Sequence, residues 1–212
     1  MKISIVVTQE EHFKFAQEIC DTIESSALLR GTGIAKRTPE YIQKKMSNGD
    51  AMIALVDGKF AGFCYIESWE HGKFVAHSGL IVHPDYRNLG LAKKIKSKVF
   101  DYSLEKYPNA KIFGITTGLA VMKINSELGY KPVPFSELTT DPSFWAGCKT
   151  CTNFPILQSK ENKMCLCTGM LYDPKDKPKD PPRHPFNEAV LKRLKKIKQA
   201  LFLNKFLSVL FS

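Results

Sequence analysis

The sequence contains no apolar run that approaches the roughly 20 residues needed to cross a lipid bilayer. Its opening stretch, MKISIVVTQEEHF, has a short apolar segment and then becomes acidic, and this segment is too short for the core of a secretory signal. We therefore expect a cytoplasmic protein. Cysteine is sparse, with six residues in 212. In that compartment such cysteines are more often thiols or metal ligands than disulfides.

Acidic residues are also under-represented, since 21 Asp and Glu face 31 Lys and Arg, which gives a net charge of +10. This surplus suits an anionic partner, either a nucleic acid, a lipid surface or a phosphorylated small molecule, and it does not choose among them. A hydrophobic content of 43% excludes a wholly disordered chain. The length suits one domain with an appendage, and no internal repeat is present.

Hydrophobic periodicity and turn residues predict a domain of alternating strands and helices. Thr38 and Pro39 form a good start for the second helix, and Asp57-Gly58 is a strong hairpin signal. The expected order is strand 3–8, helix 10–27, helix 39–48, strands 51–56, 59–68 and 73–82, helix 90–107, strand 111–117, helix 119–128 and a strand from 130. We expect this α/β domain to end near residue 147.

The stretch SGLIVHPDYRNLGLAKKI, residues 78–95, leaves a strand, passes through a loop that contains Gly90 and enters a helix. Free backbone N–H groups and the helix dipole favour an anion at such a helix start. Gly90 and Ala92 allow a diphosphate to come close to the backbone, and Arg87 adds a positive charge. An ordinary strand-to-helix turn with solvated lysines is the alternative.

The chain resembles the GNAT superfamily of acyl-CoA N-acyltransferases, whose central motif is Arg/Gln-x-x-Gly-x-Gly/Ala. Arg87, Gly90 and Ala92 match this motif, and MKINSELGYKP at 122–132 resembles the second signature of the family. The order of elements fits over residues 1 to about 135. The resemblance implies a mixed, mostly antiparallel central sheet flanked by helices. It also implies transfer of an acyl group, most simply acetyl, from coenzyme A to a primary amine.

The resemblance further implies which residues hold acetyl-CoA. The backbone amides of Asn88, Leu89, Gly90, Leu91 and Ala92 would bind its pyrophosphate. The backbone groups of Leu80 and Val82 would line its pantetheine arm. Such a cofactor accounts for part of the positive charge, and we expect no nucleic-acid partner.

Asn125 stands where many family members have a tyrosine that acts as the acid. An amide cannot release a proton, so we expect Asn125 to bind the cofactor. The proton donor is then water or another residue. For the base, Glu67 and His77 are the candidates, because both lie on strands that should face the acceptor. A strand-end glutamate in water and a histidine satisfied within the sheet are the alternatives.

The segment between the first two helices carries three cations, Arg30, Lys36 and Arg37, interrupted by Gly31 and Gly33. In the resemblance this segment borders the acceptor side of the cleft. Arginine matches a carboxylate well, which favours a small amino-acid acceptor such as glutamate. The alternative is a solvated loop.

After the acyltransferase domain, residues 1–147, comes a Cys-rich extension over residues 148–172. It contains Cys148, Cys151, Cys165 and Cys167 in a Cys-x2-Cys-x13-Cys-x-Cys pattern. Four thiolates in two close pairs can hold one tetrahedral zinc ion. The alternatives are a redox pair or four thiols that pack a small β-addition.

A proline-rich linker over 173–185 leads to a basic amphipathic helix over 186–212. This helix either docks on the domain or on the second subunit of a homodimer, or binds a membrane surface or a protein partner. A non-catalytic acyl-CoA-binding or metal-stabilised interaction protein is the alternative to an enzyme.

Overall fold

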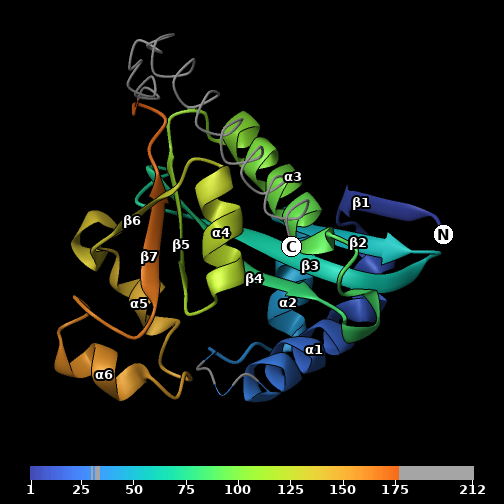
Figure 1. The fold of residues 1–212 in the computed structure, drawn as a ribbon, viewed down its shortest axis with the longest axis horizontal. Helices are drawn as coiled ribbons and strands as arrows, with labels where there is room; N and C mark the ends of the chain where they lie inside the picture. Colours follow the sequence, from blue (N-terminus) through green and yellow to red (C-terminus); the bar gives the residue numbers. More distant parts are fainter. Residues whose placement is uncertain (30, 32–33, 177–212) are drawn as a thin grey trace, which may run out of the picture. The chain divides into compact units, whose positions relative to one another are not determined.

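A seven-stranded sheet with helices on both faces makes up the computed structural model, which describes residues 1–29, 31 and 34–176 (Figure 1). The elements are β1 (Ile3–Val7), η1 (Glu10–Phe15), α1 (Ala16–Leu29), α2 (Pro39–Ser47), β2 (Ala51–Val56), β3 (Lys59–Trp69), β4 (Phe74–Val82), η2 (Pro84–Tyr86), α3 (Leu91–Lys106), β5 (Lys111–Thr116), α4 (Leu119–Glu127), β6 (Lys131–Val133), η3 (Phe135–Glu137), α5 (Pro142–Ala146), α6 (Phe154–Ser159) and β7 (Thr168–Tyr172). The predicted order of elements up to β6 is confirmed. Among the described residues, no helix is both long enough and apolar enough to cross a membrane.

The strand order is β1-β2-β3-β4-β5-β7-β6. Every neighbouring pair is antiparallel except β4 and β5, which run parallel. That parallel pairing covers only Phe74–Ala76 against Lys111–Phe113. The expected mixed, mostly antiparallel sheet is therefore confirmed, and the one parallel contact in it is short.

Local sequence signals explain where the early elements begin and end. Thr38 accepts a hydrogen bond from the backbone N–H of Tyr41, and Pro39 occupies the first turn of α2. Asp57 and Gly58 both have positive φ angles, of 48° and 78°, as a tight hairpin turn requires. The helix expected over 10–27 is divided, because its first six residues form the 3-10 helix η1 before α1 begins.

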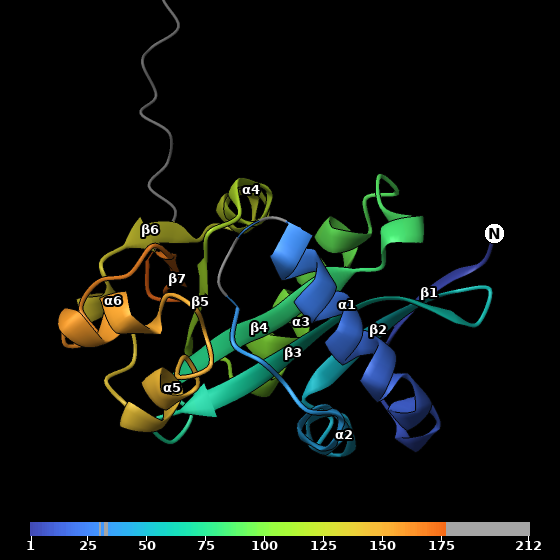
Figure 2. The same ribbon diagram turned by 90° about the horizontal axis from the view of Figure 1, so that it is seen from below.

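The two faces of the sheet carry different helices (Figures 1 and 2). On one face Ile19 of α1 and Ile42 of α2 pack against Phe63. On the other face Ile95 of α3 packs against β2 and β3. Gly62 makes this approach possible, because a Cβ atom there would lie 2.6 Å from Cδ1 of Ile95. The α3 helix is thus held close to the strands that lead into β4.

The Cys-rich extension supplies a strand of the main sheet. We expected residues 148–172 to form an addition to a domain that ended at 147. Instead, β7 inserts between β5 and β6 and pairs antiparallel with both. Gly169 allows this insertion, because a Cβ atom there would lie 2.8 Å from the carbonyl oxygen of Val133. Most of the expected linker and the whole expected C-terminal helix lie outside the described residues.

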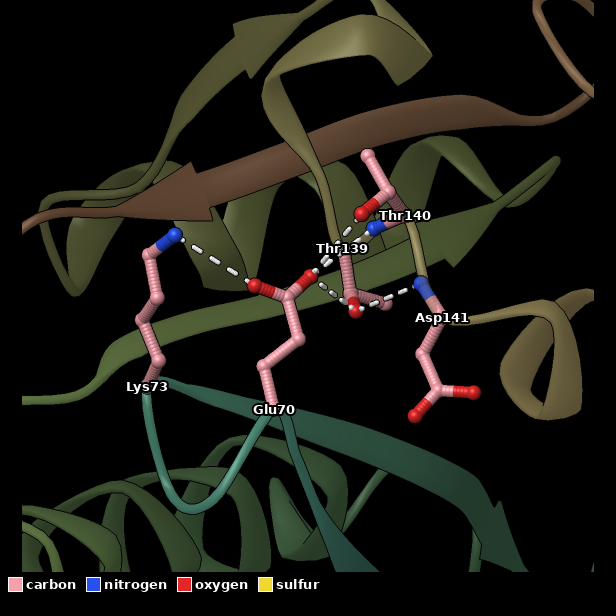
Figure 3. A network of polar contacts seen from close by, with 5 residues as sticks. All are labelled: Glu70, Lys73, Thr139, Thr140 and Asp141. Atoms are coloured by element: carbon pink, nitrogen blue, oxygen red, sulfur yellow. Dashed lines mark hydrogen bonds and ion pairs between the residues drawn. The ribbon is translucent and has the colours of Figure 1, made fainter.

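Glu70 ties the turn between β3 and β4 to the segment that leads into α5 (Figure 3). Its Oε1 accepts hydrogen bonds from Thr139 Oγ1 at 2.8 Å and from Thr140 N at 2.9 Å. Its Oε2 pairs with Lys73 Nζ at 3.3 Å. The hydrogen bond from Thr139 holds the pKa of the Glu70 carboxyl below its usual value. This carboxylate anchors the segment that leads into α5 to the turn between β3 and β4.

We predict that Glu70→Ala lowers the free energy of unfolding by about 1–2 kcal/mol at pH 7, because the hydrogen-bonding groups of Thr139 and Thr140 lose a charged acceptor. The folded pKa of Glu70 lies below its unfolded value, so this stabilisation is present above the unfolded pKa and lost as the pH falls through the folded one. Urea denaturation of wild type and variant at pH 7 and in acid measures both effects.

The matched control is Glu161→Ala, which removes an exposed carboxylate that pairs only locally, with Lys163. It should leave the stability unchanged within the error of the denaturation measurement, because exposed ion pairs contribute little. Equal stability of Glu70→Ala and wild type at pH 7 would show that the anchor contributes nothing.

Candidate active site

The separation of β4 from β5 is the main irregularity of the sheet. Their pairing ends at Ala76 and Phe113, and His77 is the first β4 residue beyond it. Two positions further on, β4 bulges, because Gly79 and Leu80 together stand opposite Cys64 of β3. The bulge bends β4 and re-aims its side chains. This point, which we call the strand parting, is bordered by polar clusters on both faces of the sheet.

Gly79 and Tyr65 fit together at the strand parting. Gly79 has a φ angle of 64°, which disfavours other residues. A Cβ atom at Gly79 would lie 2.6 Å from Cε1 of Tyr65, whose side chain is fully buried. The Tyr65 hydroxyl accepts a 2.6 Å hydrogen bond from Nε of Arg37. The bulge therefore positions an aromatic ring that in turn positions an arginine.

Arg37, Tyr41, Lys45, Tyr65 and Glu67 form a cluster on the α1 and α2 face, which we call the Arg37 cluster. The Tyr41 hydroxyl donates to Glu67 Oε1 at 2.5 Å, and Lys45 Nζ lies 3.0 Å from the same oxygen. The guanidinium carbon of Arg37 lies 5.5 Å from the Tyr41 ring centroid. Burial raises the pKa of Tyr41, so its hydroxyl stays a donor to Glu67.

The Arg37 cluster holds charges of both signs. The Glu67 side chain is only 13% exposed and has two partners that hold it. Arg37, in contrast, has no carboxylate partner among the described residues. An arginine that is partly buried without a counter-ion is suited to bind an anionic group.

A second cluster, His77, Lys96, Ser103 and Tyr130, lies on the α3 face, and we call it the His77 cluster. His77 Nε2 lies 2.9 Å from Ser103 Oγ, while Nδ1 lies 2.8 Å from Lys96 Nζ and 3.1 Å from the Tyr130 hydroxyl. Burial, and then the neighbouring Lys96, hold the pKa of His77 well below its usual value. The imidazole is therefore neutral, with Nδ1 as acceptor and Nε2–H as donor to Ser103.

The loop that joins β4 to α3 is preorganised to bind an anion. Asn88 and Gly90 have φ angles of 64° and 69°, and Gly90 is the N-cap of α3. Arg87 Nη2 donates to Ser26 Oγ at 2.9 Å, which ties the loop to α1. The N–H groups of residues 88–93 find no backbone acceptor among the described residues. They point their partial positive charge out of the first turn of α3.

Asn125 on α4 is 1% exposed, and its side-chain oxygen has no hydrogen-bond partner among the described residues. A buried acceptor without a donor is costly, which makes the Asn125 amide a group suited to bind a ligand. Leu80 and Val82 of β4 are half-buried against the α3 face. The residues that the resemblance assigns to the cofactor therefore all lie on β4, α3, α4 and the loop between β4 and α3.

The other residues predicted from the sequence lie in different parts of the structure. Glu67 and Arg37 belong to one cluster, as an acceptor site would need. His77 lies on the opposite face, against α3. Lys36 is exposed, and its Nζ pairs with Glu24 at 2.9 Å instead of joining the cluster. Arg30 lies outside the described residues.

The four cysteines of the extension lie near one another, since burial and then the neighbouring thiols of Cys165, Cys151 and Cys148 raise the pKa of Cys167. Among the described residues, no group of three or more His, Cys, Asp or Glu side chains could hold a metal ion. Two of the sulfurs also contact the backbone: Cys151 Sγ accepts from the N–H of Asn153 at 3.4 Å, and Cys165 Sγ lies 3.9 Å from the Asn153 carbonyl oxygen. The expected zinc site at Cys148, Cys151, Cys165 and Cys167 is therefore not supported.

Several residues of the two clusters were not predicted from the sequence. Tyr41 and Lys45 are four residues apart on α2, so helical spacing alone could have placed them on one face. Lys96 shares the buried face of α3 with Phe100 and Ser103, at spacings of four and three. Polar residues within this apolar stripe were the signal that could have identified Lys96. The signal was hard to recognise because four lysines lie within six residues.

We predict that Gly79→Ala lowers the free energy of unfolding by about 3 kcal/mol, because the new Cβ atom both strains a positive φ angle and overlaps the Tyr65 ring. Gly58→Ala has a similar φ angle in open space, so it should cost only about 1 kcal/mol. Chemical denaturation of both variants separates the free-energy cost of the positive φ angle from the cost of the overlap with Tyr65. Equal losses for the two variants would contradict the contact between Gly79 and Tyr65.

Comparison with known proteins places this arrangement in a family. Residues 21–120 match the model of the acetyltransferase (GNAT) family. No curated protein shows a significant sequence match to the chain.

Solved structures share the fold at low sequence identity. An acetyltransferase of the GNAT family from Staphylococcus aureus Mu50 has a TM-score of 0.58 at 16% identity, over 82% of this chain and 100% of that one. Diaminobutyrate acetyltransferase from Paenibacillus lautus has a TM-score of 0.55 at 11% identity, over 82% and 95%. N-acetylglutamate synthase from Neisseria gonorrhoeae has a TM-score of 0.57 at 13% identity; the match covers 82% of this chain and only 35% of that one.

Proposed function

The chain belongs to the acetyltransferase (GNAT) family, and from this premise we propose that it transfers the acetyl group of acetyl-CoA to the amine of a small amino acid, with glutamate as the first candidate. The observation that carries the proposal is the Arg37 cluster. In this cluster an arginine that has no carboxylate partner in the described part of the chain lies close to Glu67, a carboxylate held by Tyr41 and Lys45, beside the strand parting. These two charges complement the carboxylate and the ammonium group of one amino acid.

The residues around the strand parting fit acetyl-CoA. We assign the cofactor pyrophosphate to the N–H groups of Asn88–Ala92, with Arg87 beside them. The position above Gly90 is open, since nothing lies within 4 Å of a Cβ atom built there. Leu80 and Val82 would line the pantetheine arm, on the stretch of β4 that has no pairing with β5. The orphaned oxygen of Asn125 would accept from an N–H group of the cofactor.

Acyl transfer requires a neutral amine next to the thioester carbonyl. In our proposal Arg37 binds the acceptor carboxylate and so orients the molecule. Glu67 first pairs with the ammonium group and then accepts its proton, directly or through water. Tyr41 and Lys45 hold Glu67 for this role. When bound, acetyl-CoA supplies the activated acyl group, and the clusters supply the orientation and the proton transfers.

A lysine side chain on a protein is the alternative acceptor. Such an acceptor is cationic and favours an acidic cleft. The Arg37 cluster has two cations, Arg37 and Lys45, and one anion, Glu67, so its net charge is positive. Two solved structures with this fold have names that specify amino acids, namely N-acetylglutamate synthase and diaminobutyrate acetyltransferase. Both considerations favour the amino-acid acceptor.

We predict that Gly90→Val weakens acetyl-CoA binding at least tenfold, which is about 1.4 kcal/mol, because the side chain blocks the approach of the pyrophosphate to the backbone. Isothermal titration calorimetry measures the affinity. Gly58→Val is the control, because Gly58 also has a positive φ angle and open space but lies in a distant hairpin. Wild-type affinity in a folded Gly90→Val protein would rule out the pyrophosphate site.

We predict that amino acids outperform their carboxamides as acceptors, and that Arg37→Met raises the KM for amino acids roughly 10- to 100-fold, because an ionic hydrogen bond is lost. The KM for acetyl-CoA should stay within about threefold. Thiol release from acetyl-CoA across a panel of amines measures both values.

Lys36→Met is the matched control, because Lys36 is the adjacent cation but pairs with Glu24 on the surface. Its KM values should equal those of wild type. If carboxamides react as well as amino acids, and Arg37→Met behaves like Lys36→Met, the carboxylate site is wrong.

A further inference from the structure

We propose that Lys96 is the acid that protonates the leaving thiolate of coenzyme A, and that His77 is the positioning residue that holds it. This inference rests on the acetyl transfer proposed above. It assigns the one proton transfer that Asn125 cannot perform, since a carboxamide has no ionisable proton at neutral pH.

The position of Lys96 is the first observation. His77, the first β4 residue beyond the pairing with β5, has its carbonyl oxygen 3.3 Å from a Cβ atom built at Gly114. The two strands are therefore still close at His77, and they part beyond it. Lys96 Nζ lies 2.8 Å from His77 Nδ1, so α3 brings an amino group to the parting. It arrives on the α3 face, the face against which Leu80 and Val82 are half-buried.

The second observation is the missing counter-charge. Lys96 is 2% exposed, and no ion pair among the described residues includes it. A buried ammonium group without an anion is expensive and points to a functional role. A thiolate that forms at the strand parting would supply the missing negative charge during the reaction.

Each element packed around Lys96 contributes only neutral groups. These groups are Cys64 of β3, His77 of β4, Ser103 of α3 and Tyr130 after α4, with Tyr172 of β7 beside Tyr130. Burial raises the pKa of the Cys64 thiol to about 11 and raises the pKa of Tyr130 well above its usual value. Neither group provides an anion at neutral pH, so within residues 1–29, 31 and 34–176 no anion pairs with Lys96.

The acidity of Lys96 suits the task. Burial lowers the pKa of Lys96 to about 8, while an ordinary thiol has a pKa of about 8.5. Proton transfer between groups of matched pKa is nearly balanced in free energy, which is the condition for efficient general acid catalysis. His77 is neutral and only accepts from the ammonium group, so it orients Lys96 without competing for the leaving sulfur.

In this step the amine nitrogen forms its bond to the acetyl carbon, the C–S bond breaks, and its electron pair leaves on sulfur. A proton moves from Lys96 Nζ to that sulfur and yields free coenzyme A. The acetylated nitrogen loses its remaining excess proton to water, or to Glu67 after Glu67 has passed the first proton to solvent. Lys96 regains a proton from solvent before the next turnover.

The test is the pH dependence of kcat at saturating substrates. The acceptor amine should have a low pKa, so that it is already neutral over the whole pH range. For wild type, kcat should fall as the pH rises through about 8, where Lys96 loses its proton. Lys96→Met should lower kcat roughly 100-fold at neutral pH and abolish this fall. Its affinity for acetyl-CoA should stay within about threefold.

Two further variants give the controls. Lys98→Met removes an exposed lysine of the same helix and should show the wild-type profile. Lys96→Arg keeps the charge but holds its proton throughout the range, so kcat should be low and independent of pH. Thermal unfolding of Lys96→Arg and Lys96→Met shows whether each variant is folded. A low kcat in a folded variant is then due to loss of the acid.

A wild-type kcat that does not fall between pH 7 and 9.5 overturns the role of Lys96, even if no variant folds. So does a folded Lys96→Met protein with kcat within threefold of wild type. In both cases acetyl transfer itself still stands, because wild type turns over. Wild type that releases no thiol with any amine overturns the proposed function and this inference together.

Discussion

The early end of the pairing between β4 and β5 is the constraint on which the site depends. The two parallel strands pair over only three residue pairs and part beyond His77, where the bulge at Gly79 bends β4. Adjacent residues of β3 then face opposite clusters: Tyr65 touches Gly79 and holds Arg37, while Cys64 lies beside Lys96. One backbone irregularity therefore places an acceptor site and a proton donor on the two faces of the same strands.

Both clusters show the same electrostatic pattern. Arg37 on one face and Lys96 on the other are cations that have no carboxylate partner among the described residues, although hydrogen bonds to Tyr65 and His77 fix their positions. Burial of such charges opposes folding, and this cost is tolerated where a ligand brings the compensating charge. In our account a substrate carboxylate does so for Arg37, and the departing thiolate does so for Lys96.

The sequence was sufficient for the parts that local physics determines. Helical and strand periods, the Thr38-Pro39 start and the Asp57-Gly58 turn specify the elements up to β6, and the loop from Arg87 to Ala92 was recognisable before its geometry was known. The failures are long-range. Nothing local says that β7 inserts between β5 and β6, or that Gly79 is needed because Tyr65 packs against it. Cysteine spacing, likewise, predicts that the thiols lie near one another but does not determine whether they form a metal site.

The most direct measurement of the central claim is hydrogen–deuterium exchange of the wild-type protein with and without acetyl-CoA. Our account predicts that binding protects the amides of residues 88–93, because these N–H groups find no backbone acceptor among the described residues. It also predicts protection of β4 beyond His77, because this stretch of β4 does not pair with β5. Protection confined to other segments, with these two unchanged, would contradict the assignment of the strand parting as the cofactor site.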